Sequence, residues 1–259
     1  MALHKNSRRT FLKTGFALAG ASLIETPVLY ANTKSGLTGT GEGDHFTFLF
    51  QGDSITDGNR TRNNDWNHVM GHGYAYIIAS KLWYDFPEKK FHFYNRGISG
   101  NKITDLEQRW DTDTLALKPN LVSILIGIND TYAWINGDKQ FTPKQFEEKY
   151  RALLLKTKNE LPQVQFVLCE PFILPVENVK DKWDIYHAEV KKRQDIVQLL
   201  ATEFNAIHIA FQQAFNTALK RAPASYWIWD GVHPMPAGHE LMALEWIKQV
   251  RRKMKFIRK

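Results

Sequence analysis

The sequence predicts an α/β protein built on a doubly wound parallel sheet. Short, almost wholly apolar runs alternate with longer helical patterns from residue 45 onward. Strands that are apolar along their whole length are typical of parallel sheets covered by helices on both faces, and the alternation favours βαβ connections. With 259 residues, 43% hydrophobic and 24% charged, the chain can form one large core, and this balance excludes disordered and fibrous proteins.

The individual elements follow from these patterns. The expected strands span 46–51, 91–95, 121–126, 164–169 and 206–211. The expected helices span 74–84, 103–110, 143–161, 181–204, 211–221 and about 237–254. Pro143 suits a first helical turn with Thr142 as the cap, and Pro236 stands near the start of the last helix.

The N-terminal segment has the pattern of a twin-arginine export signal. Residues 7–13 read S-R-R-T-F-L-K, and the apolar stretch that follows, 15–24, is too short to span a membrane. Ala31 is a candidate cleavage point, so residues 1–31 are predicted to be a signal segment that uses the twin-arginine export machinery. A chance basic start is the alternative. We therefore expect a periplasmic or secreted protein without a stable membrane anchor.

Residues 32–44, rich in Gly, Thr and Ser, are predicted to form a flexible linker, which leaves 45–259 as the single folded domain. Much of the net charge of +7 lies in the N-terminal segment and in a basic cluster between Lys248 and Lys259. No nucleic-acid-binding motif accompanies this charge, so no nucleic-acid partner is expected. The single cysteine, Cys169, excludes an internal disulfide and a cysteine-based zinc site, and we expect it to be buried.

Four polar blocks lie where chemistry is expected. Ligands of such sheets bind beyond the carboxyl ends of the strands, near the point where the strand order reverses. Three blocks follow the first three expected strands, and the fourth lies near the C-terminus: 52–58 (GDSITDG), 95–101 (NRGISGN), 127–130 (GIND) and 230–234 (DGVHP). The four blocks together supply a hydroxyl, a bare glycine amide, a carboxamide and an Asp/His pair.

These groups are the parts that acyl transfer needs. The Ser54 hydroxyl can attack a carbonyl if His233 takes its proton, and Asp230, three residues before the histidine, can orient the imidazole. The Ser54 amide, the Gly100 amide and the Asn129 carboxamide are suitable donors for the oxyanion.

Each block also has a simpler interpretation. Asp53 and Ser54 could form only a helix cap, residues 129–130 an ordinary turn, and Asp230 with His233 a hydrogen-bonded loop. The combination of the four blocks in this order is what makes the pattern specific. Ser99 is interpreted as structural support. His239 has no second histidine four residues later, so it is not part of a zincin motif, and we expect it on the exposed start of the last helix.

Over residues 46–254 the chain resembles the SGNH, or GDSL-type, hydrolases, and all four family blocks are present. The resemblance implies a three-layer α/β/α flavodoxin-like fold with a five-stranded parallel sheet, and no metal or other cofactor. It also implies that Ser54, Asp230 and His233 form a catalytic triad, and that Gly100 and Asn129 join the Ser54 amide in the oxyanion hole.

Aromatic residues near the third and fourth blocks bear on the substrate. They are Tyr132, Trp134, Tyr226, Trp227 and Trp229, and their flat faces suit sugar rings, although each could simply pack in the core or a loop. Trp134 and Trp229 are the candidate substrate-binding residues. With the export signal and the family resemblance, they favour a glycan or small-molecule ester substrate and a carbohydrate O-acetylesterase.

Two alternatives to this function stay open. The first is a lysophospholipase or broad acyl-ester hydrolase with the same triad, and the second is a non-catalytic glycan-binding protein. Segments 59–72 and 132–140 beside the blocks are polar and aromatic, which favours a short acyl group over a long one.

Overall fold

The computed structural model describes residues 45–63, 65 and 67–258. The predicted signal segment, 1–31, and the predicted linker, 32–44, lie outside the described residues. In the described part of the chain, no helix has both the length and the apolar character needed to cross a membrane.

The centre of the domain is a sheet of five parallel strands in the order β2-β1-β3-β4-β5. The strands are β1 (Thr47–Gly52), β2 (His92–Asn95), β3 (Leu121–Leu125), β4 (Gln165–Cys169) and β5 (Ile207–Ile209). The chain winds from β1 to one edge and then crosses to β3 on the other side, so the strand order reverses between β1 and β3. This is the flavodoxin-like order, in which that reversal marks the binding edge.

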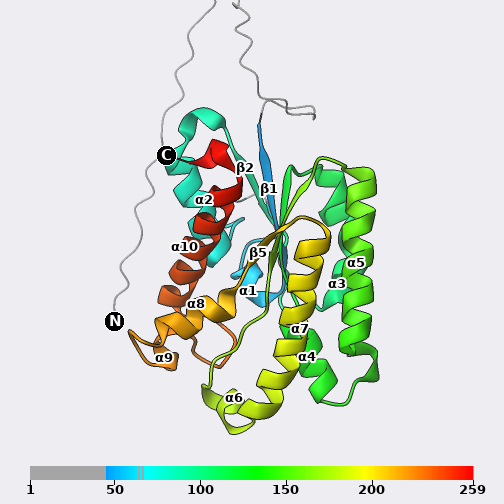
Figure 1. Cartoon of the computed structure of the whole chain (residues 1–259). Coiled ribbons are helices and arrows are strands. Elements are labelled where there is room, and N and C mark those ends of the chain that lie inside the picture. The colour runs from blue at the N-terminus through cyan, green and yellow to red at the C-terminus, as the bar shows by residue number, and fades with distance from the viewer. Residues whose placement is uncertain (1–44, 64, 66, 259) are drawn as a thin grey trace, which may run out of the picture. The chain divides into compact units, whose positions relative to one another are not determined.

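Helices cover both faces of the sheet, which makes three layers (Figure 1). One face packs against α2 (Tyr74–Asp85), α8 (Phe211–Ala218) and α10 (Pro236–Lys253). The opposite face packs against α3 (Ile103–Asp113), α5 (Pro143–Glu160) and α7 (Trp183–Glu203). The predicted α/β fold is therefore confirmed.

Alternation along the strands builds two apolar layers. Phe48 and Phe50 point to the layer under α2 and α10, whereas Leu49 between them points to the layer under α3 and α5. A buried tryptophan anchors the first layer, since Trp246 of α10 donates from its indole N–H to the Ser123 hydroxyl at 3.0 Å. Truncating such a residue to alanine costs about 3–5 kcal/mol of stability. These layers hold the carboxyl ends of the strands rigidly in place.

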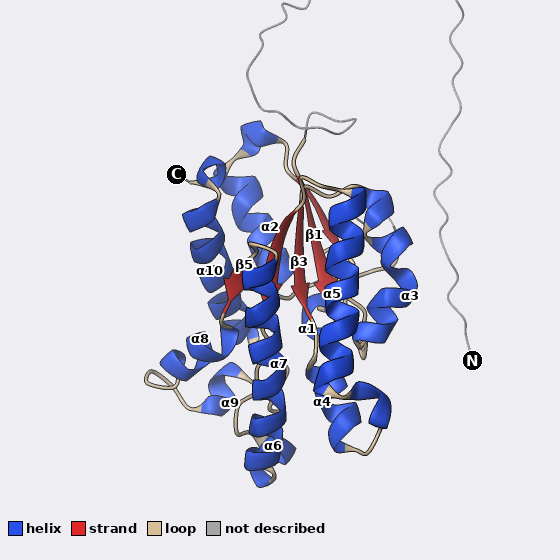
Figure 2. Ribbon diagram, turned by 45° about the vertical axis from the view of Figure 1, so that its right-hand side comes forward, coloured by secondary structure: helices blue, strands red, loops and turns tan. Residues whose placement is uncertain are grey.

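Short helices gather beneath those carboxyl ends (Figure 2). They are α1 (Ser54–Asp57), α4 (Ile128–Ile135), α6 (Glu177–Asp181) and α9 (Ala224–Trp227). Within the described residues, 3-10 turns lie at Pro87–Lys89, Leu115–Leu117, Lys139–Phe141 and Lys255–Ile257. Apart from the helix start that a cap at Asp53 would imply, the sequence patterns do not predict these short helices, because helices of one or two turns depend on tertiary packing more than on their own sequence pattern.

The long helices follow the sequence patterns with two corrections. The expected helix 181–204 begins instead at Trp183, since Lys182 leaves the helical conformation and separates α6 from α7. The expected helix 211–221 ends at Ala218. The start of α5 is confirmed, because the Thr142 hydroxyl accepts a hydrogen bond from the Gln145 amide at 3.2 Å and Pro143 follows it.

Candidate active site

The turn after β1 places Ser54 at the carboxyl edge of the sheet. Strand β1 ends at Gly52 and α1 begins at Ser54, so only Asp53 separates the two elements. Asp53 caps α1, because its carboxylate accepts a hydrogen bond from the Ile55 amide at 3.0 Å. The helix-cap interpretation of this block is therefore correct for Asp53, and the cap fixes Ser54 as the first helical residue, with its side chain half-buried.

A closed turn before α10 holds Asp230 and His233. The Trp229 amide donates to the His233 carbonyl at 3.1 Å, and Ile228 pairs with Pro234 in an antiparallel bridge. Within this turn the Asp230 carboxylate accepts from the His233 amide and contacts the His233 ring, so the two side chains lie on the same side.

Hydrogen bonds join the three side chains into one chain of contacts. Ser54 Oγ lies 2.8 Å from His233 Nε2, and His233 Nδ1 lies 2.6 Å from Asp230 Oδ2. The other carboxylate oxygen of Asp230 accepts from the backbone amides of Val232, at 3.0 Å, and His233, at 2.7 Å. The fold thus brings together a hydroxyl and an imidazole that are 179 positions apart in the sequence.

The electrostatics of this cluster follow from the same bonds. The hydrogen bond to Asp230 raises the pKa of His233, against the opposite effect of its partial burial. Burial alone would raise the pKa of Asp230, but hydrogen bonds from the His233 ring and the turn amides outweigh it and lower the pKa. Asp230 is therefore held in its ionised form, and it makes the His233 imidazole a stronger base.

The second block, residues 95–101, packs against the first, residues 52–58. Gly97 packs so closely on α1 that a Cβ would lie 2.4 Å from the Asp57 nitrogen, which excludes a side chain at this position. The Asn95 carboxamide reinforces the approach, since it donates to the Thr56 carbonyl at 2.7 Å and accepts from the Gly97 amide at 2.9 Å. Gly100 adopts a left-handed conformation with φ +83°, is exposed, and within the described residues no acceptor pairs with its amide.

The third block places Asn129 beside the second. Asn129 lies in the first turn of α4, directly after β3, and its Nδ2 donates to the Asn101 carbonyl at 3.1 Å. One N–H of the carboxamide is used in this bond, so the other is left for a ligand. The structure therefore places all the predicted site groups of blocks one to three at the carboxyl edge of the strands.

Two acidic side chains are buried beneath this edge. Burial raises the pKa of Asp53 to about 7 and that of Asp130 to about 6. Each has one carboxyl oxygen bonded to a backbone amide, from Ile55 and Ile103 respectively. The second oxygen of each lacks a partner within the described residues, so nothing there offsets the effect of burial, which disfavours the ionised form.

A cavity of about 200 Å³ opens beside Ser54. It is lined by Ser54, Ile55, Gly58, Asn59, His72, Trp229, His233, Pro234 and His239. Trp229 is 58% exposed, and its ring stacks on the His233 ring with a centroid distance of 6.0 Å and an interplanar angle of 26°. Trp134 is not among the described residues that line this cavity, and the Lys139 ammonium lies 4.7 Å from its ring centroid instead.

Sequence reasoning misplaced His239. The residue lies in the first turn of α10 as expected, but its ring is partly buried, lines the cavity and accepts a hydrogen bond from the Tyr74 amide at 3.1 Å. Its partner is 165 positions away, so no local pattern could reveal the contact.

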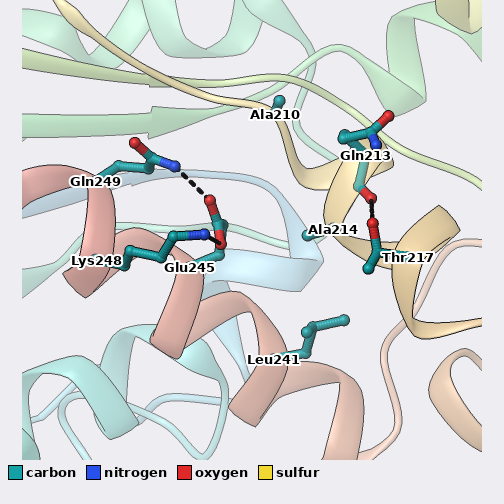
Figure 3. Close-up of a pocket in the computed structure, with 8 residues that line it drawn as sticks. All are labelled: Ala210, Gln213, Ala214, Thr217, Leu241, Glu245, Lys248 and Gln249. Carbon is teal, nitrogen blue, oxygen red and sulfur yellow. Dashed lines mark hydrogen bonds and ion pairs between the residues drawn. The ribbon is translucent and has the colours of Figure 1, made fainter. Parts of the chain in front are cut away.

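A larger cavity, of about 300 Å³, lies between α8 and α10 (Figure 3). Its lining includes Glu245, whose carboxylate accepts from Lys248 at 2.9 Å and from Gln249 at 2.5 Å. It contains none of the predicted site residues, and its lining has no hydroxyl paired with a base. Among the described residues, no three His, Cys, Asp or Glu side chains form a group that could hold a metal ion.

Comparison with known proteins agrees with the fold. The model of the GDSL-like lipase/acylhydrolase family matches residues 50–241, a span from β1 into α10. An acetylxylan esterase from Geobacillus stearothermophilus is 34% identical over 211 residues, which cover 78% of this chain and 92% of that protein.

Solved structures give the same result. A crystal structure described as a GDSL-like lipase from Parabacteroides merdae has a TM-score of 0.76 and 40% identity, covering 80% of this chain and 95% of that one. A mutant of the acetylxylan esterase has a TM-score of 0.73 and 32% identity, covering 84% and 98%. The resemblance found in the sequence blocks is thus confirmed: the chain belongs to the GDSL-like lipase/acylhydrolase family and is a carboxylic ester hydrolase.

Proposed function

We propose that the protein is a carbohydrate O-acetylesterase in which Ser54, His233 and Asp230 act as the catalytic triad. The observation that carries the proposal is the hydrogen-bonded chain from Ser54 Oγ through the His233 ring to Asp230, with bonds of 2.8 and 2.6 Å. These lengths suit proton transfer from the hydroxyl to the imidazole and orientation of the imidazole by the carboxylate.

The arrangement supports a two-step reaction. Ser54 Oγ forms a bond to the acetyl carbonyl carbon while His233 Nε2 takes the hydroxyl proton. The tetrahedral intermediate then breaks its bond to the sugar oxygen, which leaves with the proton from His233. Water attacks the resulting acetyl-serine in the same way, and the products are acetate and the restored hydroxyl.

Stabilisation of the oxyanion is assigned to three donors. As the first helical residue, Ser54 has an amide without an acceptor inside α1. The Gly100 amide and the second N–H of the Asn129 carboxamide complete the set. One such donor contributes about 10²- to 10³-fold to kcat in acyl-transfer enzymes.

Relatives support both the triad and the substrate. In structures of the G. stearothermophilus acetylxylan esterase described as catalytic mutants, a serine, an aspartate and a histidine are each replaced by alanine. The serine and histidine are 179 positions apart there and here, and in both proteins the aspartate precedes the histidine by three. The exposed Trp229 beside His233 offers a stacking surface for a sugar ring.

A chain-length series tests the acyl preference. The purified protein is given acetyl, butyryl and octanoyl esters of one alcohol, together with acetylated xylo-oligosaccharides. We expect kcat/KM to fall from acetyl to octanoyl, because a long chain gains about 0.8 kcal/mol per methylene only where apolar walls bury it. A rise up to octanoyl would favour the lysophospholipase or broad esterase alternative, and absence of labelling by a serine-reactive probe would favour the glycan-binding alternative.

Export through the twin-arginine machinery is part of the same proposal, since a periplasmic or secreted esterase meets polymeric substrates directly. It is supported by the S-R-R-T-F-L-K pattern at residues 7–13. Replacing Arg8 and Arg9 with lysine is expected to leave the protein in the cytoplasm with its signal uncleaved. Unchanged periplasmic recovery on fractionation would refute the signal.

A further inference from the structure

His239 joins two helices that are distant in sequence. It lies in the first turn of α10, and its Nδ1 accepts a hydrogen bond from the Tyr74 amide, the first amide of α2, at 3.1 Å. Gly73, the residue before Tyr74, has no side chain that could cap α2. A Cβ at Gly73 would lie only 3.2 Å from His239 Cε1. His239 therefore supplies the acceptor that the start of α2 lacks.

This contact fixes the protonation of the ring. A nitrogen that accepts a backbone N–H carries no proton of its own, so Nδ1 is unprotonated. Burial, reinforced by the neighbouring His72 and His233, lowers the pKa of His239 to about 4. The ring is therefore neutral at pH 7, and its one proton is on Nε2.

The Nε2–H group is free to bind a ligand. In the described part of the chain it has no acceptor, and it is not among the buried atoms that lack a partner. The ring lines the same cavity as Ser54, His233 and Trp229. It can thus offer a molecule in that cavity one polar group, a hydrogen-bond donor.

The position of the cavity indicates which part of an ester it receives. Its lining includes His233, whose Nε2 must reach the leaving oxygen in order to protonate it. Gly100 and Asn129, which are assigned to the carbonyl oxygen, are not among its described lining residues. The alcohol part of the ester therefore enters on the side of His239.

We propose that His239 is a substrate-positioning residue whose Nε2–H donates a hydrogen bond to an oxygen of the sugar alcohol, beside the face offered by Trp229. The inference rests on the proposed function and extends it to a determinant of alcohol specificity. An alcohol that has a hydroxyl or ring oxygen near the ester can accept a hydrogen bond from the His239 Nε2–H. The phenol part of phenyl acetate has no such oxygen, so the Nε2–H stays without an acceptor.

Two substitutions separate this role from the support of α2. In His239→Asn, the amide oxygen can replace Nδ1 as the acceptor for Tyr74, but the shorter side chain has no donor at the Nε2 position. In His239→Ala both groups are lost. His45→Asn is the matched control, because His45 is an exposed histidine next to the amino end of β1, at the edge of the sheet opposite the site.

The measurement is kcat and KM for an acetylated xylo-oligosaccharide and for phenyl acetate, together with Tm. For His239→Asn we expect kcat/KM to fall about 5- to 10-fold for the sugar ester, mainly through KM, and several-fold less for phenyl acetate. We expect the Tm of His239→Asn to stay near that of the unaltered protein and that of His239→Ala to fall.

Equal losses of kcat/KM on both substrates in His239→Asn would overturn the positioning role and leave only the contact with α2. Failure of the proposed function gives a different result: the unaltered protein would then release no acetate from any acetylated sugar while still hydrolysing phenyl acetate, and the inference would fall with it.

Discussion

The buried Asp57 carboxylate accepts hydrogen bonds from both the backbone amide and the hydroxyl of Ser99, each at 3.0 Å. Asp57 ends α1, which begins at Ser54, and Ser99 directly precedes Gly100. The two bonds therefore tie the turn that carries the proposed nucleophile to the loop that carries a proposed oxyanion donor. Arg62 binds both oxygens of this carboxylate, with Nη2 2.7 Å from Oδ2, which also accepts from Ser99, and Nη1 3.1 Å from Oδ1.

Ser99→Ala tests this connection. The substitution removes the hydroxyl but keeps the amide bond to Asp57, so the Gly100 loop is loosened without being released. We expect kcat to fall several-fold with little change in KM, because the loop acts on the oxyanion of the transition state. Steady-state kinetics on an acetyl ester measures this. Ser80→Ala, at an exposed serine of α2, is the control, and a change confined to KM would contradict the assignment.

Asp230→Asn tests the electrostatics of the triad. The hydrogen bond to Asp230 raises the pKa of His233, and activity requires the neutral imidazole. The apparent pKa of the acid limb of the kcat/KM profile should therefore lie above the ordinary histidine pKa. In the variant this apparent pKa should fall. We also expect kcat to fall by about 10⁴-fold, because a carboxamide can hold the wrong tautomer. An acid limb that does not move would exclude His233 as the titrating base.

Asp53→Asn tests the buried carboxyl under the nucleophile. Burial raises the pKa of Asp53 to about 7 from 3.8, so folding takes up a proton between these values, and the free energy of unfolding falls as pH rises through that range. Asparagine keeps the cap of α1 but cannot ionise. We expect the variant to lose less stability than the unaltered protein between pH 5 and pH 7.5 in urea unfolding. Identical pH dependence would show that Asp53 is not the group responsible.

Trp229→Ala tests the stacking surface. The ring lies against His233 and lines the cavity, so its loss should lower kcat/KM for acetylated xylo-oligosaccharides about 10-fold more than for phenyl acetate, which has no sugar ring to stack. Trp134→Ala is the informative comparison, since the sequence predicted both residues as substrate contacts and only Trp229 lines the cavity. Equal effects of Trp229→Ala on all substrates would remove the sugar-stacking role.

Much of the fold could be predicted from local patterns. The buried parallel strands are continuous apolar runs, so all five were placed to within a few residues, and Thr142 with Pro143 marked the start of α5 correctly. Helix α4 was not predicted: Gly127 before it offers no side-chain cap, and residues 129–130 read equally well as a turn. Helix α4 is stabilised by packing against α7, and the local sequence does not predict that contact.

The same distinction applies to the site. Ser54, Asp230 and His233 could be proposed because each stands in a recognisable block beside a strand end or a tight turn. The contact of His239 with Tyr74, and the separation of Trp134 from the cavity, depend on how helices far apart in sequence pack together. Periodicity and short motifs carry no information on such packing.

Ser54→Ala tests whether Ser54 is the nucleophile, through the rate of acetate release from an acetylated xylo-oligosaccharide. We expect this rate to fall by about 10⁴-fold or more, because the nucleophile is removed, with little change in Tm, because one half-buried hydroxyl is lost. Ser80→Ala should release acetate at the rate of the unaltered protein. Acetate release by Ser54→Ala at a rate near that of the unaltered protein would show that Ser54 is not the nucleophile.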